Sequence, residues 1–228
     1  MATSSTDTTG AGASTTESAA TTSTQPPADP DDVALAESVV LTLDDLPAGW
    51  ASEPATGDDG GFEEAEMRAE CPAVARAIDE LREIQGRSTG KARASFVLGD
   101  QGLPSIQSSV VVAADAGIAG RGYAMYTGDD FLDCLMSLFL TGIEDDGTTV
   151  GEVRSEPLPI DPVGDESEAV RVTVPVSANT SEVIVFVDYV VIRVDRVIHM
   201  LILGSADLFP LPDGTASMAI AAAADFAA

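Results

Sequence analysis

The sequence predicts an α+β fold: an antiparallel sheet of about six strands packed against helices, with a disordered N-terminal tether. The strongest signal is a pair of β-branched runs at 183–194 and 197–203, separated only by Asp195 and Arg196, which is typical of a hairpin of long strands. Neither run alternates cleanly between apolar and polar residues, so both faces of the hairpin are expected to be covered. Amphipathic helical segments elsewhere in the chain supply the covering layers.

The predicted tether spans residues 1–37, and the predicted single domain spans residues 38–228. Up to Asp32 the chain has no branched aliphatic and no aromatic residue, and 14 of the first 27 positions are Ser or Thr. Such a segment buries too little apolar surface to offset the entropy lost on ordering. Neither a basic n-region nor an apolar h-region follows Met1, so an exported form is expected to have lost its targeting segment, with Met1 as a vector-supplied start.

The chain is strongly acidic, with 11 Lys and Arg against 38 Asp and Glu and a net charge of −27. Phosphate backbones and anionic bilayers are repelled by such a charge, so we expect no nucleic-acid partner and membrane contact only through a lipid anchor that this sequence does not carry. Solubility is the simplest reason for the charge; high-salt adaptation and cation binding are the alternatives.

Two cysteines, Cys71 and Cys134, are the only ones in the chain. Their separation differs from the close spacing of zinc and redox motifs, and a single histidine cannot complete a Cys/His zinc site, so no metal site and no cofactor are expected. The even count suggests either a disulfide or two buried thiols. A Ser/Thr-rich leader before a folded domain is typical of extracytoplasmic proteins, which favours the disulfide.

The elements follow in order along the predicted domain. Pro72 opens a helix whose apolar positions Val74, Ile78, Leu81 and either Ile84 or Gln85 recur at helical spacing, and Gly86 is its expected end. Two alternating strands follow at 92–98 and 105–113. Asp115 caps the first of two helices, and the second covers 131–140. Strands are expected at 150–158 and 169–176 before the hairpin, and Asp213 is the expected cap of a C-terminal helix.

Three residues are candidates for a ligand cleft between sheet and helices: Trp50, Asp188 and His199. Trp50 follows a Pro-Ala-Gly turn, which delivers a large ring either as a plug over the core or to a pocket. Asp188 lies inside an apolar strand, where it pairs with an arginine of the sheet or points into a cavity. His199 is the only histidine, so any catalytic triad must use it; the alternative is a core histidine opposite Ile192.

The glycine-rich segment Gly117-Ile-Ala-Gly-Arg-Gly122 follows a strand and precedes a helix, as phosphate-binding loops do. Its order is G-x-x-G-x-G rather than G-x-G-x-x-G, and no βαβ repeat accompanies it. We therefore do not expect nucleotide binding.

Two segments together suggest a family: Leu-Asp-Asp-Leu-Pro-Ala-Gly-Trp at 43–50 and Leu-Pro-Ile-Asp-Pro-Val-Gly-Asp-Glu-Ser at 158–167. With the helix carrying Cys134-Leu135, the Val-rich hairpin and the alanine-rich C-terminal helix, the chain from Leu41 onward resembles secreted actinobacterial lipoproteins related to the extracellular sensor domain of mycobacterial serine/threonine kinase H. The resemblance implies an extracytoplasmic α+β domain, lipid-tethered or secreted, with a helix-bridging disulfide and no established enzyme activity. The lipobox cysteine and the kinase sensor's fuller cysteine set are not matched here.

The sequence therefore favours a sensor-like or ligand-binding domain of the cell envelope without catalytic activity. Its expected partner is a small or lipidic ligand, a cell-wall fragment or a cell-envelope protein. The alternatives are a structural or protein-interaction domain without a pocket and a hydrolase using His199.

Overall fold

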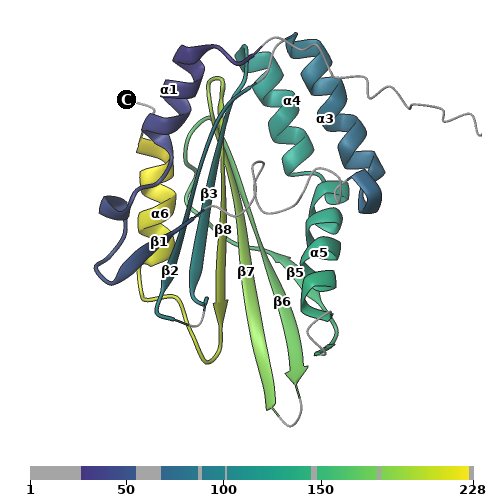
Figure 1. Cartoon of the computed structure of the whole chain (residues 1–228), viewed down its shortest axis with the longest axis vertical. Coiled ribbons are helices and arrows are strands. Elements are labelled where there is room, and N and C mark those ends of the chain that lie inside the picture. The colour runs from purple at the N-terminus through teal and green to yellow at the C-terminus, as the bar shows by residue number, and fades with distance from the viewer. Residues whose placement is uncertain are drawn as a thin grey trace, which may run out of the picture.

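The structure is a computed structural model that describes residues 27–54, 68–86, 89–100, 102–144, 148–178 and 181–225. One antiparallel sheet runs through its centre, and helices cover both faces (Figure 1). The predicted α+β class, with an antiparallel sheet against helices, is confirmed. The expected covering of both faces of the hairpin is confirmed as well.

The sheet has eight strands, in the order β1-β2-β3-β8-β7-β6-β4, with β5 also paired to β6. Their bounds are β1 Trp50–Glu53, β2 Gly90–Leu98, β3 Ser105–Val112, β4 Thr149–Val150, β5 Arg154–Pro157, β6 Glu166–Ala178, β7 Ser181–Val194 and β8 Val197–Ala206. The sequence predicted about six of them. It missed β1, and the strand expected at 150–158 is two short strands.

The hairpin formed by β7 and β8 lies at the middle of the sheet, and Val194 pairs with Val197 across the predicted Asp195-Arg196 turn. Asp195 has a positive φ of 50°, which a two-residue hairpin turn requires and which aspartate tolerates. The free side of β8 pairs with β3, from Ser105 opposite Gly204 to Val112 opposite Val197. This pairing joins the early strands to the late ones and makes a single sheet.

Helices α1 (Pro30–Val39) and α6 (Thr215–Ala224) cover one face, which we call the α6 face. Strand residues with even numbers in β2, β3 and β7 and odd numbers in β8 point to it, and Phe96, Ile106, Val190 and Leu201 form its core with Ala219 and Ala223 of α6. The N-cap of α6 is Gly214 rather than the expected Asp213.

Helices α3 (Pro72–Gln85), α4 (Ala116–Tyr126) and α5 (Asp129–Glu144) cover the opposite face, which we call the α4 face (Figure 1). Asp115 caps α4 as predicted, accepting from the Ile118 N–H at 2.8 Å. Gly122 lets α4 approach the sheet closely, because a Cβ there would lie 2.7 Å from Ile198 Cδ1. The apolar side of α5 packs on β6 and β7 through Met136, Phe139 and Leu140.

The predicted boundary of the tether at residue 37 is wrong, because the folded domain begins at Pro30. Asp29 caps α1 by accepting from the Asp31 N–H at 2.9 Å, and Ala36 is fully buried. Asp32 is buried too and forms an ion pair with Arg196 at 2.5 Å. Gly90 makes room for α1, since a Cβ there would collide with the Asp32 backbone. Residues 1–26 of the predicted tether lie outside the described residues.

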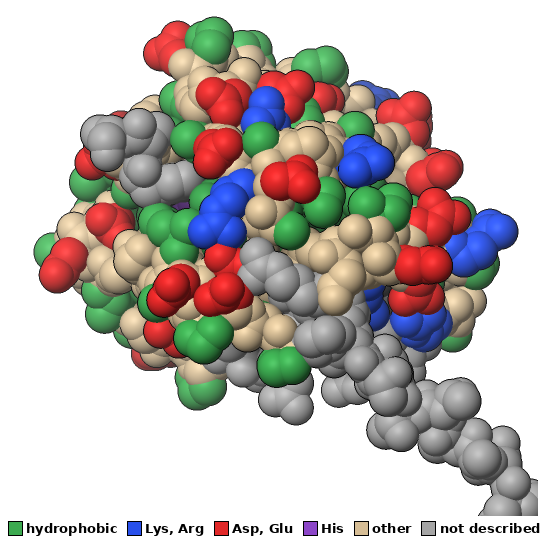
Figure 2. Space-filling view, turned by 90° about the horizontal axis from the view of Figure 1, so that it is seen from above, with side chains coloured by type: hydrophobic (Ala, Val, Ile, Leu, Met, Phe, Trp, Pro, Cys, Tyr) green, Lys and Arg blue, Asp and Glu red, His purple; other side chains and the backbone are tan. Residues whose placement is uncertain are grey.

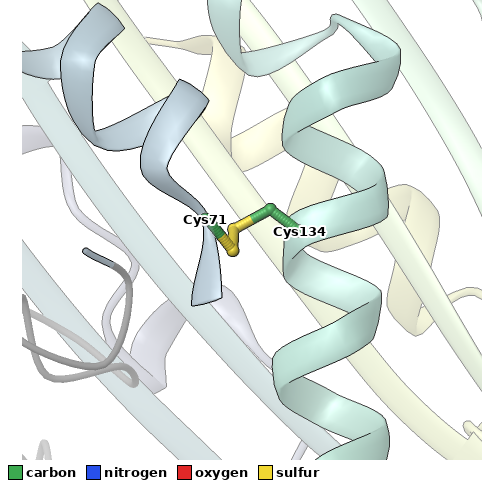
Figure 3. Close-up of a disulfide and its surroundings, with 2 residues drawn as sticks. All are labelled: Cys71 and Cys134. Atoms are coloured by element: carbon green, nitrogen blue, oxygen red, sulfur yellow. A yellow bond between two sulfur atoms is a disulfide. The ribbon is translucent and has the colours of Figure 1, made fainter. Parts of the chain in front are cut away.

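The predicted disulfide between Cys71 and Cys134 is confirmed, with an S–S distance of 2.06 Å and a Cα–Cα distance of 5.6 Å. It joins the residue before α3 to the middle of α5 (Figure 3). Val74 and Leu138 are buried beside it. The bond therefore ties the start of α3 to α5 on the α4 face.

Among the described residues, no helix combines the length and the apolar character needed to cross a membrane.

Candidate functional site

A cavity of about 330 Å³ lies between the α4 face of the sheet and the helices α3, α4 and α5. This volume is at the lower end of the range of small-molecule sites, roughly 300–1,000 Å³. Its walls come from seven elements that are far apart in the sequence: β2, β3, β7 and β8 form the floor, and the three helices form the roof.

The floor changes from polar to apolar across the sheet. Lys91 and Arg93 of β2 and Gln107 and Ser109 of β3 supply the polar half. Ile198, Met200 and Ile202 of β8 and Tyr189 of β7 supply the apolar half. The register sets this gradient, because Arg93 pairs with Ser109 and Ser109 pairs in turn with Met200.

Helix α3 presents one side to the cavity through Ala75, Ile78, Leu81 and Gln85. Ile78, Leu81 and Gln85 belong to the predicted face at helical spacing, and of the two alternatives for the last position Gln85 lines the cavity. Val74, the first predicted position, packs beside the disulfide instead, and Ala75 lines the cavity. Ile84 is 52 % exposed on the other side of the helix. Gly86 ends α3 in the left-handed conformation, as predicted.

The deep end of the cavity is aromatic. Tyr126 stacks edge-on against Phe131, with ring centroids 5.1 Å apart, and Phe131 contacts the ring of Tyr189 at 6.0 Å. The Tyr189 hydroxyl donates to the Tyr126 carbonyl oxygen at 3.2 Å. Burial raises the pKa of both tyrosines, so the phenols stay neutral and this end carries no charge.

The other end of the cavity is basic and reaches solvent. Four of the chain's 11 Lys and Arg residues line the cavity: Arg68, Arg82, Lys91 and Arg93. The side chains of Arg68 and Arg82 are 44 % and 33 % exposed. By contrast Tyr189 and Ile198 at the deep end are 4 % and 2 % exposed. No Asp or Glu is among the described residues of the lining.

Hydrogen bonds and one carboxylate hold this basic end in shape. Asp79, on the outer side of α3, accepts two hydrogen bonds of 2.8 Å from Arg68 and lies 3.6 Å from Arg82. The hydrogen bonds from Arg68 lower the pKa of Asp79, so the pair stays charged at neutral pH. On the floor, Arg93 Nε donates to Ser109 Oγ at 2.9 Å. These contacts position the guanidinium groups along the rim.

Acidic side chains outnumber basic ones on the face of the molecule that Figure 2 shows. Other arginines, like Arg68 and Arg82, are bound to carboxylates. Those away from the cavity include Arg171 with Asp188, Arg193 with Glu166 and Arg196 with Asp32.

A second hollow, of about 430 Å³, lies where the start of α3 meets the turn between α4 and α5. Its lining is mostly alanine, glycine and the acidic residues Asp129 and Asp130. It offers few large apolar side chains and no basic group among the described residues, so we regard the first cavity as the candidate site.

None of the three candidate cleft residues lines the first cavity. The cleft predicted from them is therefore not this cavity. Trp50, Asp188 and His199 all lie on the α6 face, on the opposite side of the sheet. Trp50 is 7 % exposed and packs with Phe96 and Ile220. Trp50 is therefore a plug over the core, which is the first of its two predicted roles.

Asp188 pairs with an arginine of the sheet, the first of its two predicted roles. Arg171 on the neighbouring strand donates from Nε and Nη2 to the two carboxylate oxygens, at 2.6 and 2.7 Å. The same guanidinium lies 5.7 Å from the centre of the Phe186 ring. Hydrogen bonding to Asp188 raises the pKa of Arg171. This ion pair joins two directly opposed positions of β6 and β7.

His199 is opposite Ile192, as predicted, and is fully buried beneath α6. The Leu41 N–H donates to Ser108 Oγ at 3.2 Å, Ser108 Oγ is 2.7 Å from His199 Nε2, and His199 Nδ1 is 3.3 Å from the Ala223 carbonyl oxygen. With the proton on Nδ1, every link of this chain has a donor and an acceptor. Burial lowers the pKa of His199 to about 4, so the ring is neutral. It joins four segments of the core and has no access for a substrate.

Two further expectations concern metals and nucleotides. Among the described residues, no group of three or more His, Cys, Asp or Glu side chains could hold a metal ion. The glycine-rich segment 117–122 lies within α4 rather than in a loop. Its backbone N–H groups are therefore engaged in the helix, apart from those of the first turn.

The fold and the cavity define a class of protein: a single antiparallel sheet covered by helices on both faces, with a disulfide-held helix over an apolar cavity whose rim is basic. No protein-family model matches the chain, and no curated protein is significantly similar to it.

Proposed function

We propose that this chain is a ligand-binding domain without catalytic activity, and that its site is the cavity between the α4 face and the helices α3, α4 and α5. The observation that carries the proposal is the lining of the deep end by large apolar side chains, among them Tyr189, Ile198 and Phe131. A partly enclosed space with such walls favours apolar ligands over water, because water there finds few polar partners.

We also propose an extracytoplasmic location and the sensor-like role that the resemblance to the kinase H extracellular domain implies. The disulfide supports the location, because disulfides persist in oxidising compartments. The sensor-like role is supported by α3, which roofs the cavity and contacts α4 and α5. A ligand that fills the cavity would press on this helix first.

The alternative of a structural or interaction domain without a pocket is less well supported, because the cavity exists and its walls come from seven elements. The hydrolase alternative is disfavoured by the burial of His199, which leaves no exposed surface on that ring.

The test fills the cavity with a large side chain. Ile78 lines the cavity, so Ile78→Trp places an indole where the ligand would lie. With the neutral fluorescent probe N-phenyl-1-naphthylamine, we expect the wild-type protein to bind and Ile78→Trp to bind at least about tenfold more weakly, equivalent to roughly 1.4 kcal/mol.

The matched control is Ile84→Trp, which adds the same side chain on the exposed side of the same helix. Its affinity for the probe should equal that of the wild type. Absence of probe binding by the wild type, or equal binding by Ile78→Trp and Ile84→Trp, would contradict the proposal.

A further inference from the structure

We infer that the ligand is a single-chain amphiphile with an anionic oxygen head group, whose alkyl chain enters the aromatic end of the cavity and whose head is bound by the basic rim. This inference rests on the proposed function, because it assigns a chemical class to the ligand of the same cavity. It goes further by giving the four rim cations a role in recognition.

The first argument is the order of the groups along the cavity. Lys91 and Arg93 stand two residues apart on β2, so both point to the same face of the sheet. Arg82 faces them from α3. The neutral tyrosines and Phe131 line the same cavity, and Arg82 and Arg93 lie close enough to Tyr126 to oppose the rise that burial causes in its pKa. A ligand that uses both kinds of lining carries a charged group on an otherwise apolar body.

The second argument is charge. The chain has a net charge of −27, so its surface as a whole repels anions and attracts cations. Four of the 11 basic residues nevertheless line this cavity, and none of the described lining residues is acidic. Asp79, which lies outside the lining, is the carboxylate that binds Arg68 and Arg82. Carboxylate and phosphate oxygens are the groups that guanidinium and ammonium ions bind most strongly, because these hydrogen bonds are charge-assisted.

The third argument concerns the physical state of the ligand. The overall charge disfavours docking on an anionic bilayer, which would bring the acidic surface close to the lipid head groups. A cavity of about 330 Å³ is also too small for a two-chain lipid and suits a compact amphiphile. The ligand is therefore bound as a single molecule taken out of solution or handed over by another protein.

Isothermal titration calorimetry with three probes of equal chain length tests the inference: decanoate, 1-decanol and decyltrimethylammonium. We expect decanoate to bind at least about tenfold more tightly than decanol, because its carboxylate makes charge-assisted hydrogen bonds to the rim and the decanol hydroxyl does not. Decyltrimethylammonium should bind most weakly, and the affinity for decanoate should fall as salt is raised.

The variant Lys91→Gln/Arg93→Gln removes two rim charges and keeps polar side chains. Its affinity for decanoate should fall about tenfold or more, while its affinity for decanol stays within about twofold. Arg82→Gln is a second variant, which tests the roof if the strand variant does not fold. Arg76→Gln on the exposed side of α3 is the matched control and should bind decanoate like the wild type.

The outcomes separate the inference from the proposed function. Equal binding of decanoate and decanol, or an unchanged decanoate affinity in both rim variants, overturns the anionic head group and leaves an apolar site in place. Failure of all three probes to bind overturns the proposed function itself.

Discussion

Replacing both cysteines by alanine, as Cys71→Ala/Cys134→Ala, is expected to lower the free energy of unfolding by about 4 kcal/mol. The disulfide closes a loop with a sequence separation of 63, and loops of this size lose about 4 kcal/mol of unfolded-state entropy when cross-linked. Alanine is suitable because both sites are 6–7 % exposed and lie among apolar residues, where a serine hydroxyl would add its own cost. The loss is large compared with the roughly 5–15 kcal/mol that stabilises a typical domain.

Urea unfolding followed by the fluorescence of Trp50 measures this loss. Trp50 is the only tryptophan and is buried on the α6 face, so its signal reports global unfolding. Wild-type protein treated with a thiol reductant serves as the control and should show a similar loss, since it also lacks the cross-link. A loss below about 1 kcal/mol would show that the disulfide contributes little to the fold.

The second large effect is a loss of stability in acid that depends on His199. The pKa of its ring is lowered to about 4 in the folded protein and is 6.5 for the unperturbed side chain. The unfolded chain therefore takes up the proton first as the pH falls. The contribution of His199 is fully present above pH 6.5 and is lost as the pH falls from 6.5 through 4, by about 3 kcal/mol in total at roughly 1.4 kcal/mol per pKa unit.

The measurement compares the wild type with His199→Gln in urea unfolding at several pH values between 7.5 and about 4.5. The variant loses absolute stability, because its side chain replaces a buried ring between Ser108 and Ala223. The carboxylates are common to both proteins, so the difference between the two pH profiles isolates the histidine. The wild type should lose more stability toward acid, and parallel profiles would contradict the burial of a neutral imidazole.

The central part of the fold follows directly from local sequence patterns. The hairpin of β7 and β8 was predictable because two long β-branched runs flank a two-residue turn. The helix α3 was predictable from Pro72 at its start, Gly86 at its end and an apolar face between them. The disulfide followed from the cysteine count and the character of the leader.

The misplaced domain boundary has a tertiary cause. The helix α1 carries two aspartates in its first turn and few large apolar side chains, so its composition resembles that of the leader. Two features hold α1 on the sheet: the ion pair of Asp32 with Arg196, a residue 164 positions away, and the space that Gly90 leaves for the helix backbone. Neither feature can be recognised from the sequence around α1.

The cavity was not predicted because its walls come together only in three dimensions. The predicted site residues Trp50, Asp188 and His199 were chosen as unusual side chains in apolar surroundings, and each is satisfied within the core. One signal was present: Lys91, Arg93 and Ser95 alternate with Ala92 and Ala94 on β2. A strand with a basic side, in a sheet covered on both faces, indicates that this side borders solvent or a charged ligand.

Methyl NMR of the wild-type protein titrated with decanoate tests the account most directly, because it locates the ligand residue by residue. The account predicts that the methyl signals of Ile78, Leu135 and Ile198, which line the cavity, shift on binding. Those of Ile106, Leu201 and Leu203, buried on the α6 face, should keep their positions. Shifts confined to the α6 face, or no shifts at all, would contradict a ligand site between the sheet and the disulfide-held helix.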